Sequence, residues 1–318
     1  MTRPDALPAA PPPLAPGKFR DPYVTARGET RATVAPATLR TLWINTGTLC
    51  NITCANCYIE SSPRNDALVY PTVADILPYL DEAAALGTGE IGFTGGEPFM
   101  NRHLPAMLDA VLERGFRALV LTNAMKPMRN HEDALRAVGA RAGGRLTLRV
   151  SLDHYAAERH DVERGAGSFA QALDGLAWLS RNGFIVHVAG RSAFGEGEGA
   201  MRAGYAALFA AHGIPIDADD PVALMLFPEM DARVDVPEIT TACWGILGKR
   251  PDAVMCATSR MVVKRRGADA PTVVACTLLP YDPQFDLGPT LAGALRPVAL
   301  NHPHCAKFCV LGGAACAA

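Results

Sequence analysis

The sequence lacks an excess of either charge, a long apolar run and a recognisable targeting pattern. Its 318 residues carry 30 basic and 32 acidic side chains, for a formal net charge of −2, so no basic patch indicates a nucleic-acid partner. No run of about 18 uncharged apolar residues exists, which argues against a membrane-spanning helix. The first residues also lack the basic-then-apolar pattern of a secretory signal. We therefore expect a cytoplasmic protein with neither a nucleic-acid nor a membrane partner.

The composition is that of a folded protein rich in thiols. Hydrophobic residues make up 49% of the chain and charged residues 19%, which is enough to bury a sizeable core and excludes wholesale disorder. The chain has nine cysteines. In a reducing compartment we expect these to be metal ligands or reactive thiols rather than disulfides.

Three regions of the chain differ in pattern. Residues 1–37 are rich in Pro and Ala and have no apolar period, which is typical of a disordered or loosely docked leader. Residues 38–236 alternate strand and helix patterns, so we predict a parallel sheet with helices outside it. Six such units fit a partial (β/α)6 TIM-like barrel better than a full eight-stranded one. Residues 237–318 lose the helical period and hold six of the cysteines, so we predict a small cysteine-rich domain there.

Local patterns place the elements of this barrel. Strands are predicted at residues 42–45, 90–94, 116–123, 146–153, 184–189 and 222–227. Helices are predicted at residues 73–85, 104–114, 168–182 and 201–212, with Thr72 and Ser168 as N-terminal caps. In the last region, residues 261–265 and 272–275 flank Gly267 like the arms of a hairpin.

Cys50, Cys54 and Cys57 form a C-x3-C-x2-C pattern directly after the first predicted strand. Barrel folds place their chemistry at the carboxyl ends of strands. Three thiolates within eight residues suit a single soft-metal centre, and both iron–sulfur clusters and zinc take cysteine ligands. Three cysteines on a four-iron cube would leave one iron open to a cofactor or substrate. A zinc site completed from elsewhere in the chain is the alternative.

This spacing and its position resemble the radical S-adenosylmethionine (SAM) superfamily, over roughly residues 40–230. The resemblance implies a [4Fe–4S] cluster on these cysteines, with SAM bound to the open iron and cleaved reductively to a 5′-deoxyadenosyl radical. That radical would abstract hydrogen from a substrate, and a flavodoxin- or ferredoxin-type reductant would supply the electron. Family members often have an aromatic or bulky apolar residue just before the third cysteine. Here Asn56 stands in that place and Tyr58 follows the cysteine, so both are candidate SAM contacts.

The segment Thr94-Gly95-Gly96-Glu97-Pro98 ends the second predicted strand. Two glycines allow a ligand to approach the backbone closely, and a carboxylate can accept from an ammonium group. Alone the segment would be only a turn, but after the cysteine pattern it looks like the GGE motif that meets the SAM amino group in the family. The resemblance implies further SAM contacts from polar residues at later strand ends, for which loop-capping hydrogen bonds are the alternative. These candidates are Asn123, Ser151, Asp153 and Arg191.

The remaining cysteines resemble the SPASM and Twitch extensions of radical SAM enzymes. Cys256 and Cys276 bracket the predicted hairpin, while Cys305, Cys309 and Cys316 form a C-x3-C-x6-C pattern near the end of the chain. The resemblance implies one auxiliary [4Fe–4S] cluster, held by the first two cysteines and two of the last three. Two clusters, a mixed site, zinc or simply buried thiols are alternatives. The sixth cysteine of this region, Cys243, is either a cluster ligand or a small core residue.

The resemblance thus implies an oxidoreductase-like radical SAM enzyme that acts on a peptide or protein side chain. Auxiliary clusters of this type also occur in enzymes for small molecules, so a small-molecule dehydrogenase or rearrangement enzyme is the first alternative. A non-catalytic iron–sulfur electron-transfer protein or zinc-binding protein is the second. Such a carrier would need neither a SAM pocket nor a closed cavity.

Overall fold

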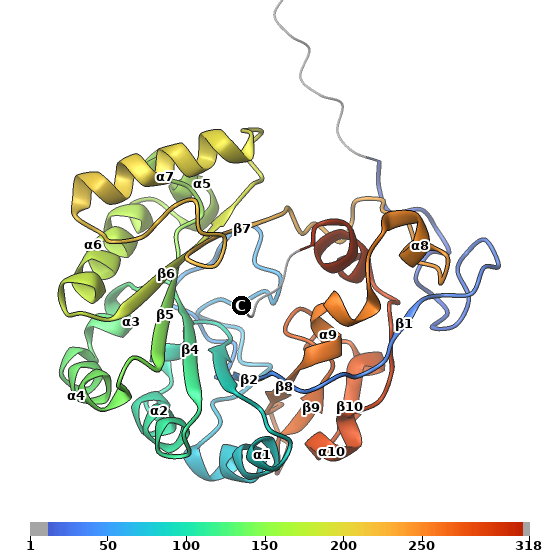
Figure 1. The fold of residues 1–318 in the computed structure, drawn as a ribbon, viewed down its shortest axis with the longest axis horizontal. Coiled ribbons are helices and arrows are strands. Elements are labelled where there is room, and N and C mark those ends of the chain that lie inside the picture. The colour runs from blue at the N-terminus through green and yellow to red at the C-terminus, as the bar shows by residue number, and fades with distance from the viewer. Residues whose placement is uncertain (1–11, 314–318) are drawn as a thin grey trace, which may run out of the picture.

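The computed structural model describes residues 12–313, and a sheet of nine strands runs through them in the order β10-β9-β8-β2-β3-β4-β5-β6-β7. Strands β2 to β7 pair in parallel. Figure 1 shows them curving into a partial barrel with helices around its outer face. The six strands are β2 (Thr41–Asn45), β3 (Glu90–Thr94), β4 (Arg117–Thr122), β5 (Leu146–Ser151), β6 (Ile185–Arg191) and β7 (Leu224–Phe227). Each lies within two residues of the bounds predicted from the sequence.

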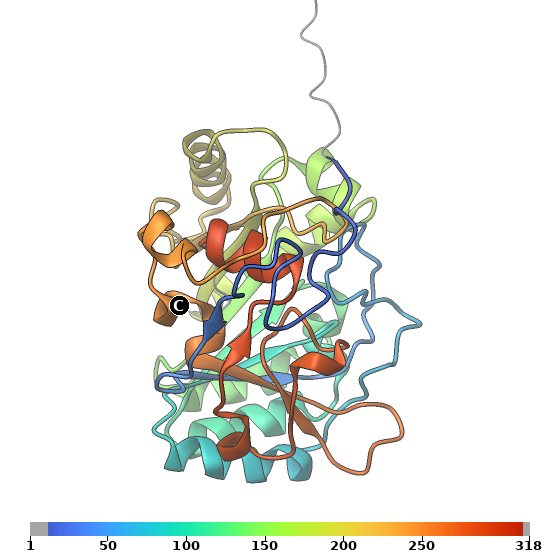
Figure 2. The ribbon, with the colours of Figure 1, turned by 90° about the vertical axis from the view of Figure 1, so that its right-hand side faces the viewer.

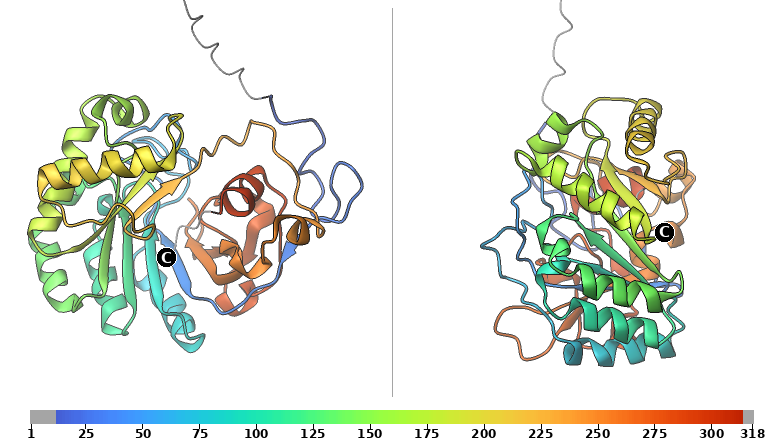
Figure 3. Two further views of the ribbon diagram at one scale, coloured as in Figure 1. Left: turned by 45° about the horizontal axis from the view of Figure 1, so that its top comes forward. Right: turned by 90° about the vertical axis from the view of Figure 1, so that its left-hand side faces the viewer.

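Helices cover the outer face of this barrel, as the right-hand view of Figure 3 shows. They are α1 (Val73–Ala85), η1 (Pro98–Met100), α2 (Leu104–Glu113), α3 (Lys126–Arg129), α4 (Glu132–Ala142), α5 (Ala157–Arg164), α6 (Ser168–Arg181) and α7 (Glu198–His212). The patterns predicted α1, α2, α6 and α7 but not α3, α4 and α5. The reason is that α3 has only four residues, α4 has a low mean hydropathy and α5 buries only His160.

The helix starts follow from short polar contacts. Thr72 caps α1 as predicted, since its side chain accepts from the Asp75 N–H while the Asp75 carboxylate accepts from the Thr72 N–H. The prediction that Ser168 caps α6 is wrong, because Gly167 holds the cap position and Ser168 is the first helical residue. The capping carboxylate comes instead from Asp161, which accepts from the backbone N–H groups of Gly167 and Phe169 at 2.7 and 2.8 Å. A carboxylate at a helix start also suits the helix dipole.

The barrel core explains why the strands read as continuous apolar runs. All five residues of β2 are buried, because helices cover one side and the barrel interior the other. Trp43 fills this layer so tightly that a Cβ on Gly92 of the neighbouring strand would lie 2.3 Å from its ring. No helix within residues 12–313 is long and apolar enough to cross a bilayer.

Three strands of the C-terminal region, β8 to β10, continue the barrel sheet. Strand β8 (Ser259–Val263) pairs in parallel with β2, and β9 (Thr272–Val274) pairs antiparallel with β8, which confirms the predicted hairpin. β10 (Asp286–Gly288) then pairs antiparallel with β9. The remaining elements are α8 (Cys243–Leu247), η2 (Pro251–Ala253), α9 (Met255–Thr258), η3 (Pro283–Phe285), α10 (Leu291–Ala294), β11 (Val298–Ala299) and the π-helical turn η4 (Cys305–Leu311). The domain boundary at residue 237 stays a prediction.

The N-terminal leader packs onto this C-terminal region, as Figure 2 shows. Strand β1 (Thr33–Val34) pairs antiparallel with β11. Arg31 is 2% exposed and forms an ion pair with Glu238 at 2.5 Å, beside the fully buried Ala32. The prediction of a disordered or loosely docked leader is therefore wrong for residues 12–37, because prolines prevent a helix but not packing against a surface. Its remaining part, residues 1–11, lies outside the described residues.

Candidate active site

The cysteine loop after β2 is fastened to the turn after β3. In the parallel register Asn45 lies beside Thr94, so both strands end at the same edge. From there the Gly96 N–H donates to the Gly47 carbonyl at 2.8 Å, and the Glu97 N–H donates to the Leu49 carbonyl at 3.2 Å. The start of the loop that carries the cysteines is thereby fixed by backbone contacts to the GGEP segment.

Two glycines make this close approach possible. A Cβ on Gly96 would lie 2.1 Å from the Leu49 carbonyl oxygen, and one on Gly95 would lie 2.4 Å from the Gly47 carbonyl oxygen. Gly95 also has a φ of +138°, which L side chains rarely adopt. The predicted need for glycine is explained by the approach of the cysteine loop itself.

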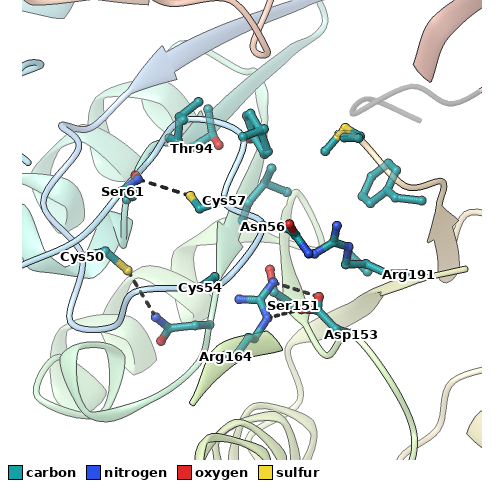
Figure 4. A pocket seen from close by; sticks show the side chains of 18 of the residues that line it. Cys50, Cys54, Asn56, Cys57, Ser61, Thr94, Ser151, Asp153, Arg164 and Arg191 are labelled. Atoms are coloured by element: carbon teal, nitrogen blue, oxygen red, sulfur yellow. Dashed lines mark hydrogen bonds and ion pairs between the residues drawn. The ribbon is translucent and has the colours of Figure 1, made fainter. Parts of the chain in front are cut away.

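A cavity that is partly open to solvent lies inside the barrel beside this loop (Figure 4). Most of the site residues predicted from the sequence contribute to its wall. They are Cys50, Cys54, Asn56, Cys57, Tyr58, Thr94, Gly95, Gly96, Asn123, Ser151, Asp153 and Arg191. Glu97 and Pro98 are not among the lining residues, and their contacts with SAM stay predictions.

The three thiols differ in their surroundings. Cys50 is buried, while Cys54 and Cys57 are half-buried. Burial raises the pKa of Cys50 to about 12 and also raises that of Cys54. The Ser61 N–H donates to the Cys57 sulfur at 3.3 Å (Figure 4). Soft-metal binding would release the protons of the buried thiols.

Glu97 lies behind the cavity wall. Its carboxylate accepts from the Thr122 hydroxyl at 2.8 Å, the Asn123 N–H at 2.8 Å and the Phe99 N–H at 3.2 Å. It is 1% exposed, and this burial raises its pKa to about 7. The carboxylate thus joins the turn after β3 to the end of β4, and through Asn123 it supports a residue that lines the cavity.

Asp153 and Arg164 form a buried ion pair in the cavity wall (Figure 4). The Asp153 carboxylate accepts from Nε and Nη2 of Arg164 at 2.8 and 2.9 Å. Burial acts to raise the pKa of Asp153, but the Arg164 guanidinium outweighs it and holds that pKa below its usual value. Burial acts to lower the pKa of Arg164, but Asp153 raises it above its usual value, and the nearby thiols of Cys54 and Cys57 add to this rise. This arginine therefore places a permanent cation near the cysteine loop.

Arg164 was not among the residues predicted from the sequence. It ends α5, which follows β5, and it reaches back over eleven residues to Asp153. The one local signal was the Arg164-Gly165 pair, since glycine commonly follows a helix end. The signal is weak, because nothing local to the helix reveals the partner.

Arg191 is engaged by carboxylates of this chain. Its guanidinium lies 3.0 Å from Glu163 and 3.2 Å from Glu229, and Glu163 also accepts from the Asn56 side chain at 3.1 Å. A carboxylate of SAM would therefore have to share or replace one of these partners. The proposed contacts of Arg191 and Asn56 with SAM stay predictions.

A second, smaller cavity collects four of the C-terminal cysteines. Its wall is otherwise apolar, and the cysteines that line it are Cys256, Cys276, Cys305 and Cys309. Burial raises the pKa of Cys256 to about 11 and raises that of Cys305 well above its usual value. Cys243 does not line it and instead contacts Thr240 at 3.4 Å, while Cys316 lies outside the described residues. Within residues 12–313, no three His, Cys, Asp or Glu side chains gather tightly enough to hold a single metal ion.

Topology explains how distant cysteines meet here. Cys256 precedes β8 and Cys276 follows β9, and the antiparallel pairing puts both at the open end of the hairpin. Cys305 and Cys309 are four residues apart in the π-helical turn and line the same cavity. Phe308, between them in sequence, lines the larger cavity, so this turn contributes to both walls.

Comparison with known proteins gives this arrangement a family. Residues 44–200 match the family model described as the Radical SAM superfamily. The chain belongs to this superfamily. The predicted superfamily is thereby confirmed.

Curated relatives match less than half of this radical SAM chain. The antilisterial bacteriocin subtilosin biosynthesis protein AlbA of Bacillus subtilis is 33% identical over 141 residues, which cover 44% of this chain and 30% of AlbA. The Fe-coproporphyrin III synthase of Methanosarcina barkeri is 34% identical over 141 residues, covering 43% and 33% of the two chains. The match thus spans about a third of the length of these relatives.

Solved structures share the fold over most of the chain. Streptococcus suis SuiB bound to S-adenosylmethionine aligns with a TM-score of 0.58 at 12% identity, covering 80% of this chain and 63% of SuiB. The tagged form of anSMEcpe with bound AdoMet aligns with a TM-score of 0.55 at 12% identity, covering 80% and 77%. The alignments extend beyond the barrel strands, so the C-terminal region is part of the shared fold.

Proposed function

We propose that this chain is an enzyme that holds a [4Fe–4S] cluster on Cys50, Cys54 and Cys57 and cleaves SAM reductively to a 5′-deoxyadenosyl radical. The observation that carries the proposal is the cavity that joins these three thiols to the Gly95-Gly96 turn and to polar strand ends. Three thiolates leave a fourth coordination site of the cube open. When bound, the cluster supplies the electron that breaks a carbon–sulfur bond of SAM.

The polar side chains and the backbone of the cavity wall are suited to hold SAM. We infer that backbone carbonyl groups of Thr94, Gly95 and Gly96 accept hydrogen bonds from the methionine ammonium. The side chains of Asn123 and Ser151 would contact the ribose and carboxylate of SAM. The Asp153–Arg164 pair keeps the wall rigid, because a bidentate pair fixes both side chains.

Much of the cavity wall is apolar. Its apolar residues include Leu121, Phe227, Met230, Leu278 and Phe308. Such a wall excludes water from the reacting atoms, which limits side reactions of a reactive intermediate. The same wall can bind an apolar part of the substrate.

We further propose that Cys256, Cys276, Cys305 and Cys309 hold one auxiliary [4Fe–4S] cluster. Four thiols line a single cavity, which is the number that a fully ligated cube requires. Full ligation favours an electron-transfer role. The shared π-helical turn would put such a cluster close to the larger cavity, where an electron could be exchanged with a substrate radical.

We propose a peptide or protein side chain as the substrate. Two proteins with the same fold were solved with peptides bound, SuiB with its precursor peptide SuiA and anSMEcpe with the Cp18Cys peptide. The partly open cavity would admit a side chain while the backbone stays outside. An external one-electron reductant would supply the electron for SAM cleavage.

The test is SAM cleavage by the anaerobically reconstituted protein with dithionite as the reductant. We expect 5′-deoxyadenosine and methionine in equal amounts, and no product from Cys57→Ala. Cys243→Ala is the matched control, because its thiol lies outside both cavities. Unchanged 5′-deoxyadenosine formation by Cys57→Ala would refute the proposed cleavage.

A further inference from the structure

Arg260 in β8 is a buried cation with no ion-pair partner among the described residues. It is 1% exposed. Its guanidinium donates only to backbone carbonyls, and none of the ion pairs within residues 12–313 includes it. The four acceptors are Cys256 at 2.5 Å, Ser259 at 2.8 Å, Ala294 at 2.9 Å and Arg296 at 3.2 Å.

Two other arginines with largely buried side chains are each paired with a carboxylate. Arg31 pairs with Glu238, and Arg164 pairs with Asp153. Carbonyl groups satisfy the N–H donors of Arg260 but do not cancel its charge. A buried charge without a counter-charge is strongly disfavoured, so the position of Arg260 calls for an anion nearby.

Burial lowers the pKa of Arg260, while the nearby thiols of Cys256 and Cys276 act to raise it. Both line the small cavity described above. As neutral thiols they offer no full negative charge. Four thiolates around an oxidised [4Fe–4S] core carry a net charge of −2, which becomes −3 on one-electron reduction.

We propose that Arg260 is the fixed counter-cation of the auxiliary cluster and raises its reduction potential. This inference rests on the proposed function, in which four C-terminal cysteines hold that cluster. Reduction adds one electron to the cluster, from dithionite in the test or from a substrate radical in turnover, and no bond or proton changes. A buried cation stabilises the more negative state more than the less negative one.

The contrast with the first site sharpens the inference. The cation near Cys54 and Cys57, Arg164, is held by Asp153, so the pair adds little net charge. Arg260 has no such carboxylate. The auxiliary cluster is therefore set up to accept an electron more readily than it would without this arginine. Arg260 acts through the cluster and touches no substrate, so it is a tuning residue rather than a catalytic one.

The experiment isolates the auxiliary cluster in the full chain with Cys50, Cys54 and Cys57 all changed to Ala. After anaerobic reconstitution, the midpoint potential is measured by redox titration, with electron paramagnetic resonance of the reduced cluster as the readout. Adding Arg260→Met or Arg260→Gln should shift the midpoint to a more negative value, while Arg260→Lys should stay near the parent value. Arg265→Met is the control, because Arg265 belongs to the same hairpin but pairs with Asp286 near the surface.

Each outcome decides the inference. An unchanged midpoint in Arg260→Met and Arg260→Gln would show that Arg260 only braces the backbone. If these two variants bind no iron while Arg260→Lys binds it with a midpoint near the parent value, the positive charge is required to hold the cluster and the inference stands. Loss of iron from all three Arg260 variants would show that the hydrogen bonds of the guanidinium to the backbone, and not its charge, are required, which would overturn the inference. If the parent triple variant binds no iron, the auxiliary-cluster proposal fails, whatever Arg260 does.

Discussion

The two cysteine sites of this protein are built in opposite ways. The first takes three thiols from one short loop and opens onto a cavity that polar residues also line. The second takes four thiols from three places in the chain and encloses them in an apolar wall. Three ligands in an accessible cavity suit a centre that must bind another molecule. Four ligands, which leave no iron open, suit a centre that exchanges only electrons.

The sites also differ in what fixes them. The cysteine loop is attached to the GGEP segment by backbone contacts between neighbouring parallel strands. The second site depends on the hairpin of β8 and β9 together with the π-helical turn. Breaking one site should therefore leave the other intact, and the predictions below test this separation.

The largest expected effect is the loss of a whole cluster. Cys276→Ala removes one of four thiolates at the second site, and water does not replace a thiolate in holding iron. We expect iron to fall from about eight to about four per chain, as the loss of one cube requires, while 5′-deoxyadenosine formation without substrate persists. Iron analysis and product assays check this, with Cys243→Ala as the control. Full iron content in Cys276→Ala would remove this thiol from the ligand set.

A pH effect on stability is expected from Glu97. Its pKa is about 7 in the folded protein against an ordinary 4.5, so the native state holds the proton more tightly. Its stabilisation is complete below pH 4.5 and is lost as pH rises through 7. The unfolding free energy of the metal-free protein should thus fall by about 2 kcal/mol from about pH 5.5 to about pH 8 on account of this group.

Glu97→Gln should abolish this part of the pH dependence, because an amide does not titrate. Urea unfolding of both metal-free proteins at the two pH values measures the difference. The cysteines titrate alike in both proteins, so their contribution cancels. An identical pH dependence in the two proteins would show that Glu97 does not titrate in this range.

A smaller effect is expected when a methyl group is added between the cysteine loop and the turn after β3. Gly96→Ala places a Cβ against the Leu49 carbonyl, so the cysteine loop must shift. We expect SAM cleavage to fall by roughly tenfold or more, since small displacements of reacting groups are costly, with iron at the second site unchanged. Gly197→Ala is the control, because no atom lies within 4 Å of the place that its new methyl group would take. Equal activity of the two variants would contradict the proposed support.

Much of the barrel could be predicted from the sequence because its signals are local. The apolar strands and the Thr72 cap are each encoded within a few neighbouring residues, and so is the loop of Cys50, Cys54 and Cys57. The partners of Arg164 and Arg31 could not be predicted in the same way, because Asp153 and Glu238 lie opposite them only in the folded chain.

The same reasoning applies to the second site. The sequence shows that cysteines are frequent after residue 237, but it does not show which of them share a cavity. The pairing of β8 with β9 supplies that information for Cys256 and Cys276, and the fold of the π-helical turn supplies it for Cys305 and Cys309.

The smallest effect is expected at Asn56, which stands where family members often have an aromatic or bulky apolar residue. Its side chain donates to Glu163, a partner of Arg191, so its main contact in this structure is within the protein. Losing one such partly exposed hydrogen bond costs about 0.5–1.5 kcal/mol. Asn56→Ala should therefore weaken SAM binding by about threefold to tenfold if it acts through Glu163, as measured by equilibrium dialysis with the reconstituted protein. A loss of more than about a hundredfold would instead make Asn56 a principal SAM contact, because the loss of one hydrogen bond to Glu163 cannot account for it.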